Sequence, residues 1–518
     1  MLPEYIAKQM KDAERFENYE INESLFEGEH YKLFNIDEQE KKLNKYEYIA
    51  YDILAQAVGI KVDLIWREAP EIHFDSEQTQ KVFDELRAST RFDEKMRNAT
   101  QAMLIYGDSP VKVAVDDNSE TKDEKLELCL YNLEPENWFP DYNKYNPAKP
   151  AKANTLIFEK KIDKACYYLL ETHEPNRIIW TAFEKLEGKD EYVQVRPLDY
   201  FKEELTGVVG DDAKEGIVET KFEITYTTKC QYSLLQVLRN DTDPSDYFGV
   251  SDFTLPVVSK INALNNFANL ANFVIATNSI PKLILSENAS KMLSNIIENI
   301  NSQSQGAEIE NPTSFLQDPK TTFLNKTSYL QSYIYREMLQ KMKAFEDGGR
   351  GETKYLTNNF DLEQIRKQHE IFFNTLMSEL SISEVLYNPK LTTGALSGVA
   401  YTRLMSTTIN AIDNIKRKLE PFIQKVVYTM LDLANNANVV KVEAQMPQVK
   451  FRDGIVNDSV EDLDAVIKKV QNQLLPTVEA IKQANNITIE EAKKYEAEIQ
   501  ASLPEPVTVE ALPKTENL

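Results

Sequence analysis

The sequence has few of the residues on which covalent frameworks and metal sites depend. Three cysteines and four histidines occur in 518 residues. The cysteines are too few and too scattered for a disulfide framework, so we expect free thiols in a reducing compartment such as the cytosol. The histidines lie far apart, and no second histidine or cysteine accompanies any of them at metal-ligand spacing. We therefore expect no metal site and no catalytic histidine.

Long hydrophobic runs are also missing. No stretch reaches the roughly 18 uncharged apolar residues of a membrane span, because asparagines interrupt the apolar run at residues 261–281. Residues 1–20 are amphipathic and charged, whereas a signal peptide has an apolar centre. We expect an intracellular protein without a membrane partner.

Positive charge is scarce relative to negative charge. The chain has 59 lysines and arginines against 83 aspartates and glutamates, a formal net charge of −24. Tight, sequence-independent binding of nucleic acid depends on cations that neutralise phosphates, so this balance argues against it. The charge is still compatible with a protein that touches DNA without holding it.

Motifs of known enzyme chemistry are incomplete. The segments "GVSDF" (249–253) and "GALSG" (394–398) lack the G-x-S-x-G turn that presents a nucleophile after a strand. Residues 241–252 match part of a calcium loop, but Asp246 replaces its glycine and the closing glutamate is absent, which favours a capped turn before a helix. No glycine-rich phosphate loop with a lysine occurs. We expect no catalytic residue, no cofactor and no enzymatic activity.

The composition that is present, with 42% hydrophobic residues, is typical of a globular protein of several domains. In the first part of the chain, hydrophobic spacing predicts helices at 37–59, 79–90 and 91–107, and a strand-like alternation at 59–74. Residues 111–238 alternate with a period of two, which predicts an antiparallel sheet. The fold class is therefore α+β, mostly helical, with a strand-rich insertion.

The second half of the chain is mainly helical by its spacing. Residues 397–436 predict one long helix with a kink at Pro421. Thr488 and Glu491 form a capping-box pattern at the start of the last short helix, and residues beyond Leu503 are expected to be disordered. Further helices are predicted at 289–300, 325–349 and 361–380, and strands at 280–286, 352–360 and 449–458.

One predicted helix, after Pro256, has an unusual polar face. Between Phe253 and Pro281 its only charge is Lys260, yet neutral amides recur every three or four residues on one side. Such a helix fits the core of a monomer, with the amides bonded to loops, or the wall of an oligomeric channel, and helix physics does not separate the two. The amides belong to Asn262, Asn265, Asn266, Asn269 and Asn272.

Four separated segments carry a family resemblance. "YFGVSDFTLPVVSKINALNNFANLANF" resembles a Gly-x-Ser-Asp entry followed by a helix rich in Asn, and "KYLTNNFDLEQIRKQHEIFFNTLMSEL" a strand with its following helix. "GALSGVAYTRL" contains a Ser-Gly-x-Ala motif, and "VKFRDGIVND" precedes "TIEEAKKYEAEI". In this order the segments resemble the portal proteins of tailed bacteriophages, in particular long-tailed phages of Gram-positive bacteria. The motif residues are Gly249, Ser251, Asp252, Ser397, Gly398 and Ala400.

The resemblance implies a ring, typically of twelve subunits, at one capsid vertex, through which double-stranded DNA is packaged and ejected. It implies as partners other copies of the chain, non-specifically bound sliding DNA, the terminase large subunit, the major capsid and scaffolding proteins, and a head-to-tail adaptor. The expected location is the virion, and the bacterial cytoplasm during assembly. The alternative is another ring-forming adaptor or scaffold protein of a prophage-derived particle.

The same resemblance implies a division of the chain. The expected parts are a wing at 1–253 (helical layer 1–110, strand-rich region 111–240), a stem helix at 254–281, a clip at 282–356, a second stem helix at 357–381, a tunnel loop at 382–396, a kinked helix returning to the wing at 397–454, a crown at 455–503 and a disordered tail at 504–518.

It also implies residues that meet DNA. Lys260, Arg366 and Lys367 on the stem helices and Lys390 are candidate guides. The two cations on the second stem helix can instead pair with Glu363 and Glu370 of that helix. Asn262, Asn266 and Asn269 would face the bore or a neighbouring subunit. The tunnel-loop candidates are Tyr387, Asn388, Lys390, Thr392 and Thr393.

Overall fold

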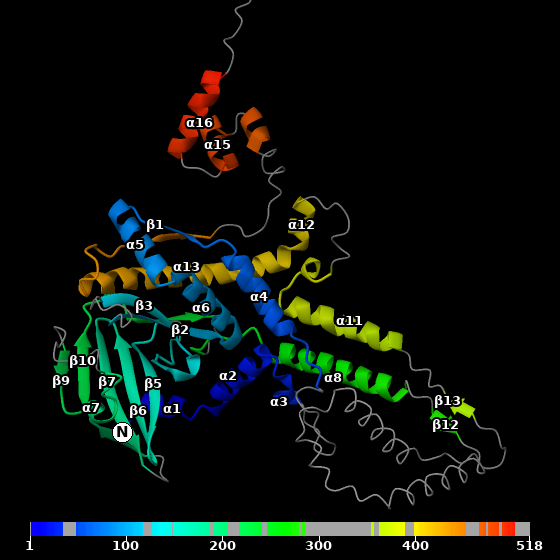
Figure 1. The fold of residues 1–518 in the computed structure, drawn as a ribbon, viewed down its shortest axis with the longest axis horizontal. Helices are drawn as coiled ribbons and strands as arrows, with labels where there is room; N and C mark the ends of the chain where they lie inside the picture. Colours follow the sequence, from blue (N-terminus) through cyan, green and yellow to red (C-terminus); the bar gives the residue numbers. More distant parts are fainter. Residues whose placement is uncertain are drawn as a thin grey trace, which may run out of the picture. The chain divides into compact units, whose positions relative to one another are not determined.

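The chain folds into two compact units, Met1–Asn262 with Phe373–Leu518, and Ala263–Phe372. The computed structural model describes residues 2–34, 48–117, 126–147, 149–186, 191–205, 217–240, 246–278, 282–284, 354–356, 362–388, 398–451, 466–472, 475–485 and 489–502. Both helices and antiparallel strands are present, so the fold is mixed α+β as predicted (Figure 1). No helix among these residues is both long and apolar enough to cross a membrane.

The first unit contains most of the described helices. Helices α5 and α6 match their predictions, and α6 ends at Gly107 as expected. The helices are α1 (Glu4–Gln9), α2 (Ala13–Phe26), α3 (His30–Phe34), α4 (Ile53–Trp66), α5 (Glu77–Ser89), α6 (Phe92–Tyr106), α7 (Pro197–Tyr200), α12 (Gly398–Leu404), α13 (Ser406–Asn436), α15 (Thr477–Asn485) and α16 (Ile489–Ser502), with 3₁₀ turns η1 (Pro135–Asn137) and η3 (Glu384–Leu386).

Two antiparallel sheets form the predicted strand-rich region. One has seven strands in the order β4-β5-β6-β7-β10-β9, with β8 also pairing β7, and the other has the order β11-β2-β3. Leu2, just before α1, and Ile6 of α1 are buried against the larger sheet. Helix α13 contacts β2 and β11 of the smaller sheet. The strands are β2 (Asp108–Asp117), β3 (Leu126–Asn132), β4 (Trp138–Asp141), β5 (Ala153–Ile162), β6 (Ala165–Glu174), β7 (Arg177–Lys185), β8 (Tyr192–Val195), β9 (Ile217–Glu219), β10 (Glu223–Thr227) and β11 (Leu235–Arg239).

The prediction for residues 37–74 is wrong in two places. Residues 48–52 are not helical, and the segment from 59 to Trp66 continues helix α4 instead of forming a strand. Its buried residues recur at helical spacing, including Leu54, Val58 and Val62 with Lys61 among them. The buried lysine made a helical pattern look like an alternating one.

Only Glu71–His73 of that segment is a strand, β1. It pairs with β14 (Gln448–Lys450), so Ile72 lies opposite Val449. A strand at the start of the predicted range 449–458 is thus present, and residues 452–458 lie outside the described part of the chain. The short ladder connects the beginning of the first unit to its later part.

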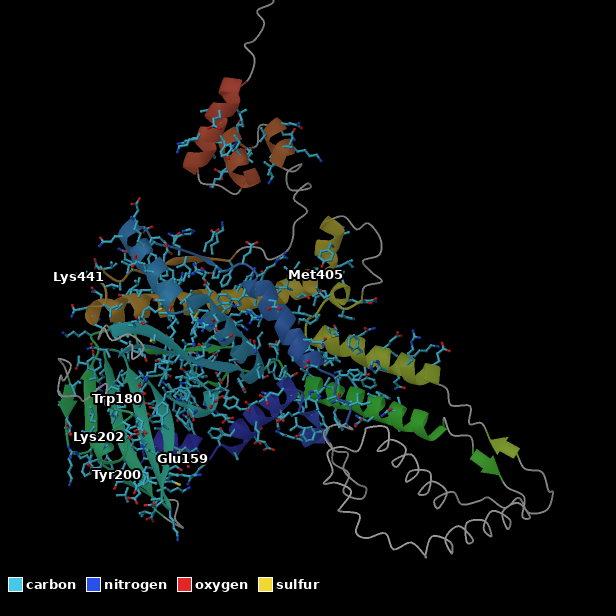
Figure 2. The ribbon with its side chains drawn as sticks, viewed as in Figure 1. Glu159, Trp180, Tyr200, Lys202, Met405 and Lys441 are labelled. Atoms are coloured by element: carbon cyan, nitrogen blue, oxygen red, sulfur yellow. The ribbon has the colours of Figure 1, made fainter. Side chains whose placement is uncertain are left out.

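The predicted long helix at 397–436 is divided. Met405 separates α12 from α13 (Figure 2). The backbone N–H of Thr408 donates to Ser383 Oγ at 3.2 Å, and its hydroxyl donates to Ser381 O at 3.1 Å. A continuous helix would direct that N–H to the carbonyl four residues earlier, so these bonds mark a new helix start. Helix α13 then runs through Pro421 to its end.

The second unit includes parts of two helices and a two-stranded sheet. Helices α8 (Leu255–Asn278) and α11 (Leu362–Glu379) each cross a boundary between the units. Strands β12 (Lys282–Ile284) and β13 (Lys354–Leu356) each lie within a predicted strand range, and the structure shows that they pair with each other. The helices expected at 289–300 and 325–349, Thr488 of the capping box and the tail beyond Leu503 lie outside the described residues.

Candidate functional site

The segment Gly249–Asp252 lies where α6 ends and β2 begins. Gly107 terminates α6 with a φ of +89°, a conformation that favours glycine. A Cβ at Gly107 would lie 2.4 Å from the carbonyl oxygen of Gly249, and one at Gly249 would lie 2.0 Å from the oxygen of Gly107. The two backbones can approach this closely only because both residues are glycine.

Ser251 and Asp252 complete the end of α6. The Ser251 hydroxyl donates to Ile105 O at 2.5 Å, and the backbone N–H of Asp252 donates to Leu104 O at 3.0 Å. These carbonyl groups belong to the last turn of α6, where carbonyl groups have no N–H partner within the helix. The Ser251 hydroxyl also accepts the N–H of Phe253 at 2.9 Å. The segment before α8 is therefore fixed to α6 by backbone and side chain together.

The Asp252 carboxylate joins three further elements. It accepts Lys61 Nζ of α4 at 2.6 Å and Asn240 Nδ2, just after β11, at 3.0 Å. Asn240 Oδ1 in turn accepts Lys418 Nζ of α13 at 2.9 Å. The Lys61 side chain is 7% exposed and that of Asp252 18%, so water screens the pair weakly. This network attaches the start of α8 to α4 and α13.

A second network lies on the other side of Gly249. Asp108 is buried, and its carboxylate accepts the N–H of Gly249 at 3.0 Å and the Tyr19 hydroxyl at 3.0 Å. Tyr19 accepts Arg15 Nε at 3.1 Å, and the Arg15 guanidinium lies 4.1 Å from the centre of the Phe248 ring. Burial raises the pKa of Asp108 to about 6, although the Gly249 N–H and Arg15 oppose the rise.

The arrangement joins several elements of the fold. The hydroxyl of Ser251 and the carboxylates of Asp108 and Asp252 are bonded to backbone, tyrosine, amide and lysine partners. No group of three or more His, Cys, Asp or Glu side chains suited to a metal ion occurs among the described residues. What the site does is fix where α8 begins relative to α4, α6 and α13.

Comparison with protein families identifies the chain. A family model described as phage portal protein, SPP1 Gp6-like, matches residues 7–505. The chain belongs to this portal family. No curated protein matches it. Among solved structures, one match is a chain of the virion of a native gene transfer agent particle, with 10% identity and a TM-score of 0.39 over 83% of this chain and 88% of that one.

Three of the four predicted guide cations of this portal protein are ion-paired. Lys260 Nζ of α8 lies 2.5 Å from Glu379 of α11. Arg366 lies 3.8 Å from Glu370, and Lys367 lies 3.7 Å from Glu363 on the same helix. Arg366 and Lys367 thus pair with glutamates of their own helix, which was the alternative to a role as guides. All four of those side chains are exposed, so each pair contributes little stability.

The asparagines of α8 occupy different environments. Asn265 is fully buried, and its backbone carbonyl oxygen accepts a hydrogen bond from Asn269 Nδ2 at 2.7 Å. Asn262 is half-buried, whereas Asn266 and Asn272 are exposed. The amide face of α8 therefore includes both buried and exposed side chains.

The beginning of the predicted tunnel loop packs against α11. The Tyr387 ring centre lies 5.2 Å from that of Phe373, and its hydroxyl lies 3.4 Å from Asn374 Oδ1. Asn388 Nδ2 donates to Glu384 at 2.9 Å. In the Ser-Gly-x-Ala motif, Gly398 begins α12 and Ala400 is half-buried within it. Lys390, Thr392, Thr393 and Ser397 lie outside the described residues.

Sequence reasoning found the motif of this portal site but missed its partners. Lys61 was hidden in a segment interpreted as a strand, and Asn240 and Lys418 have no local pattern that marks them. Asp108 had a weak signal, since it follows the helix-ending Gly107 at a position where a buried strand begins.

Proposed function

We propose that this chain forms the portal ring of a phage-type capsid and that double-stranded DNA passes through its centre during packaging and ejection. The family match over residues 7–505 carries the proposal. We assign residues 1–253 to the wing, α8 and α11 to the stem, 282–356 to the clip and 455–503 to the crown. Terminase and the head-to-tail adaptor would dock at the clip.

The charges of the stem helices suit a channel that must let DNA slide. Each unpaired lysine or arginine that neutralises a phosphate adds affinity, and a ring multiplies every such contact. Lys260, Arg366 and Lys367 are each close to a glutamate, which reduces the attraction that they exert on a phosphate. Asn266 and Asn272 add exposed polarity without charge.

The motif site has a mechanical role in this proposal. Force exerted on α8 by passing DNA or by a docked motor would be transmitted to α4, α6 and α13 through Asp252, Ser251 and Asn240. A buried network with many partners resists such displacement better than one surface ion pair.

The ring is tested on the purified full-length chain. Native mass measurement and negative-stain imaging should show closed rings with a central hole. A protein that stays monomeric at micromolar concentration, or forms open filaments only, would contradict the portal assignment.

A further inference from the structure

A cavity of about 360 Å³ lies within the first unit, away from the motif site. It is bounded by β2, by β6, β7 and β10 of the larger sheet, and by the end of α13. Its volume falls in the range of small-molecule sites, roughly 300–1,000 Å³. Trp180, Leu234 and Leu433 are among its walls and are themselves nearly inaccessible to solvent. These three residues give the cavity an apolar wall.

One part of the wall is charged. Lys112 Nζ lies 2.6 Å from Glu171 Oε1, and His173 Nε2 lies 2.9 Å from the same oxygen. Burial alone would raise the pKa of Glu171, but Lys112 and His173 together hold it at about 2, whereas burial lowers the pKa of His173. At neutral pH the cluster thus consists of a carboxylate, an ammonium and a neutral imidazole. An ammonium has three donors, of which Glu171 takes one.

The rim adds a second cation. Lys229 is exposed and lines the cavity, as does Asn438, and both have a φ of +57°. With Lys112 and Lys229 positive and Glu171 negative, the charged groups lining the cavity leave one positive charge without a counter-charge in the lining.

We propose that this cavity binds a small monoanion with an apolar body, such as an aromatic carboxylate. The body would lie against Trp180 and Leu433, and the carboxylate would accept the free donors of Lys112 near the Lys229 ammonium. This inference does not depend on the proposed portal ring.

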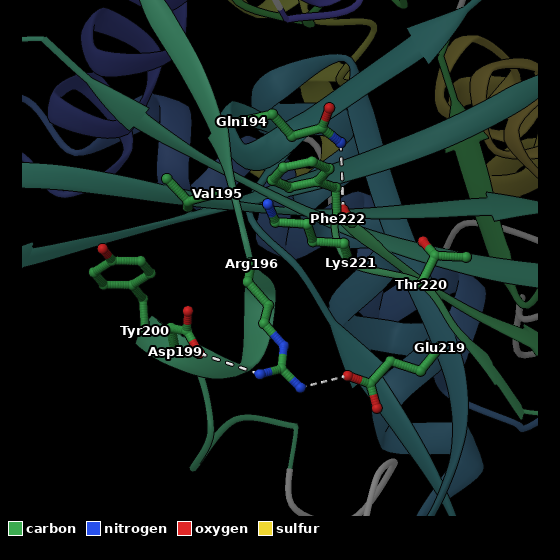
Figure 3. Close-up of a pocket in the computed structure, with 9 residues that line it drawn as sticks. All are labelled: Gln194, Val195, Arg196, Asp199, Tyr200, Glu219, Thr220, Lys221 and Phe222. Carbon is green, nitrogen blue, oxygen red and sulfur yellow. Dashed lines mark hydrogen bonds and ion pairs between the residues drawn. The ribbon is translucent and has the colours of Figure 1, made fainter.

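Another hollow of the same unit provides a contrast and a control. Beside β8, Arg196 lies 2.9 Å from Glu219 and 3.8 Å from Asp199, with Tyr200 and Phe222 nearby (Figure 3). The two cations of the lining, Arg196 and Lys221, are matched by the two carboxylates, so an anion entering there would meet no net positive charge. Arg196→Gln is therefore a variant that should leave binding of the anion unchanged.

Calorimetric titration of the full-length chain tests the class of ligand. We expect 1-naphthoate to bind at least about tenfold more tightly than 1-naphthamide or 1-naphthylmethylammonium, because a charged hydrogen bond adds about that much discrimination. Binding of none of the three, or of all three alike, would overturn the proposal.

Variants locate the binding to this cavity. Ala437→Phe adds a ring at a half-buried lining position and should weaken naphthoate binding at least about tenfold, whereas Asn435→Phe, exposed and not in the lining, should not. Lys112→Met with Glu171→Met replaces the ion pair by apolar side chains of similar length and should remove the preference for the anion. Unchanged affinity in Ala437→Phe, or an anion preference retained in the double variant, would contradict the proposal.

Discussion

Asp108 shows how a buried side chain links the stability of the fold to pH. Its pKa is raised by burial from 3.8 to about 6, so the folded chain holds this proton more strongly than the unfolded chain does. The stabilisation that protonation gives is complete below the unfolded value and is lost as the pH rises through about 6. The difference corresponds to about 3 kcal/mol.

Asp108→Asn should remove this dependence. An asparagine can still accept the Gly249 N–H through Oδ1 and can donate to the Tyr19 hydroxyl, so the fold should be retained. Between pH 4 and pH 6, the free energy of unfolding of the original chain should fall relative to that of the variant, by up to about 3 kcal/mol. Urea unfolding at several pH values measures this. Asp63→Asn removes an exposed carboxylate and controls for the loss of charge. If stability depended on pH in the same way in Asp108→Asn as in the original chain, the raised pKa of Asp108 would be refuted.

Substitution of Gly249 should be destabilising for a steric reason. In Gly249→Ala the new Cβ would lie 2.0 Å from a backbone oxygen that no rotamer change can move, so the segment must shift. We expect a loss of at least about 3 kcal/mol in the free energy of unfolding. Gly59→Ala is the matched control, because no atom lies within 4 Å of its Cβ and alanine favours the helix by up to about 1 kcal/mol. Equal effects of the two substitutions would disprove the close approach.

At the scale of elements, one ion pair decides how α4 is attached to the start of α8. A double-mutant cycle with Lys61→Met and Asp252→Asn should give a coupling energy of about 1–3 kcal/mol, because both groups are largely shielded from water. The Arg97–Asp63 pair has the same separation of 2.6 Å but is 42% and 68% exposed, so its cycle should give less than about 1 kcal/mol. Similar couplings for the two pairs would mean that burial is not what strengthens the first.

The elements also show what the sequence could and could not predict. Helices α5, α6 and α11 and strands β2, β3, β5, β6, β7, β8 and β10 lie at segments that local periodicity predicted. The short strands β4, β9 and β11 were not predicted individually. The second half of α4, from residue 59 to Trp66, was mistaken for a strand because its buried Lys61 has a partner that is distant in sequence. The division at Met405 depends on Ser383, which no local pattern connects to Thr408.

The candidate site also has residues that the sequence identified and residues that it did not. Family resemblance located Gly249, Ser251 and Asp252, since motif residues are recognised in sequence order. Their partners Lys61, Asn240 and Lys418 come from three separate elements that only the folded chain brings together. A buried polar network is specified by tertiary contacts and has no periodicity of its own.

At the scale of the whole molecule, the proposed tunnel loop can be separated from ring formation. Tyr387 and Asn388 pack within the subunit, so the deletion of residues 389–393 spares them. We expect rings of unchanged mass but capsids that package or retain less DNA, measured as DNA protected from nuclease per particle. Tyr387→Ala is the contrasting variant, because loss of its packing against Phe373 should lower stability as well. Normal DNA content after the deletion would contradict a role for the loop.

The short ladder between β1 and β14 has a consequence for biosynthesis. Ile72 pairs with Val449, so a strand made early in translation has no partner until most of the chain has left the ribosome. Helix α13, which contacts β2 and β11, also arrives late. Joining segments so distant costs loop-closure entropy and makes folding slow. Until β14 and α13 have been synthesised, the apolar surfaces that they cover on the earlier strands stay exposed. This nascent stage is therefore the one at which we expect the protein to need a chaperone most.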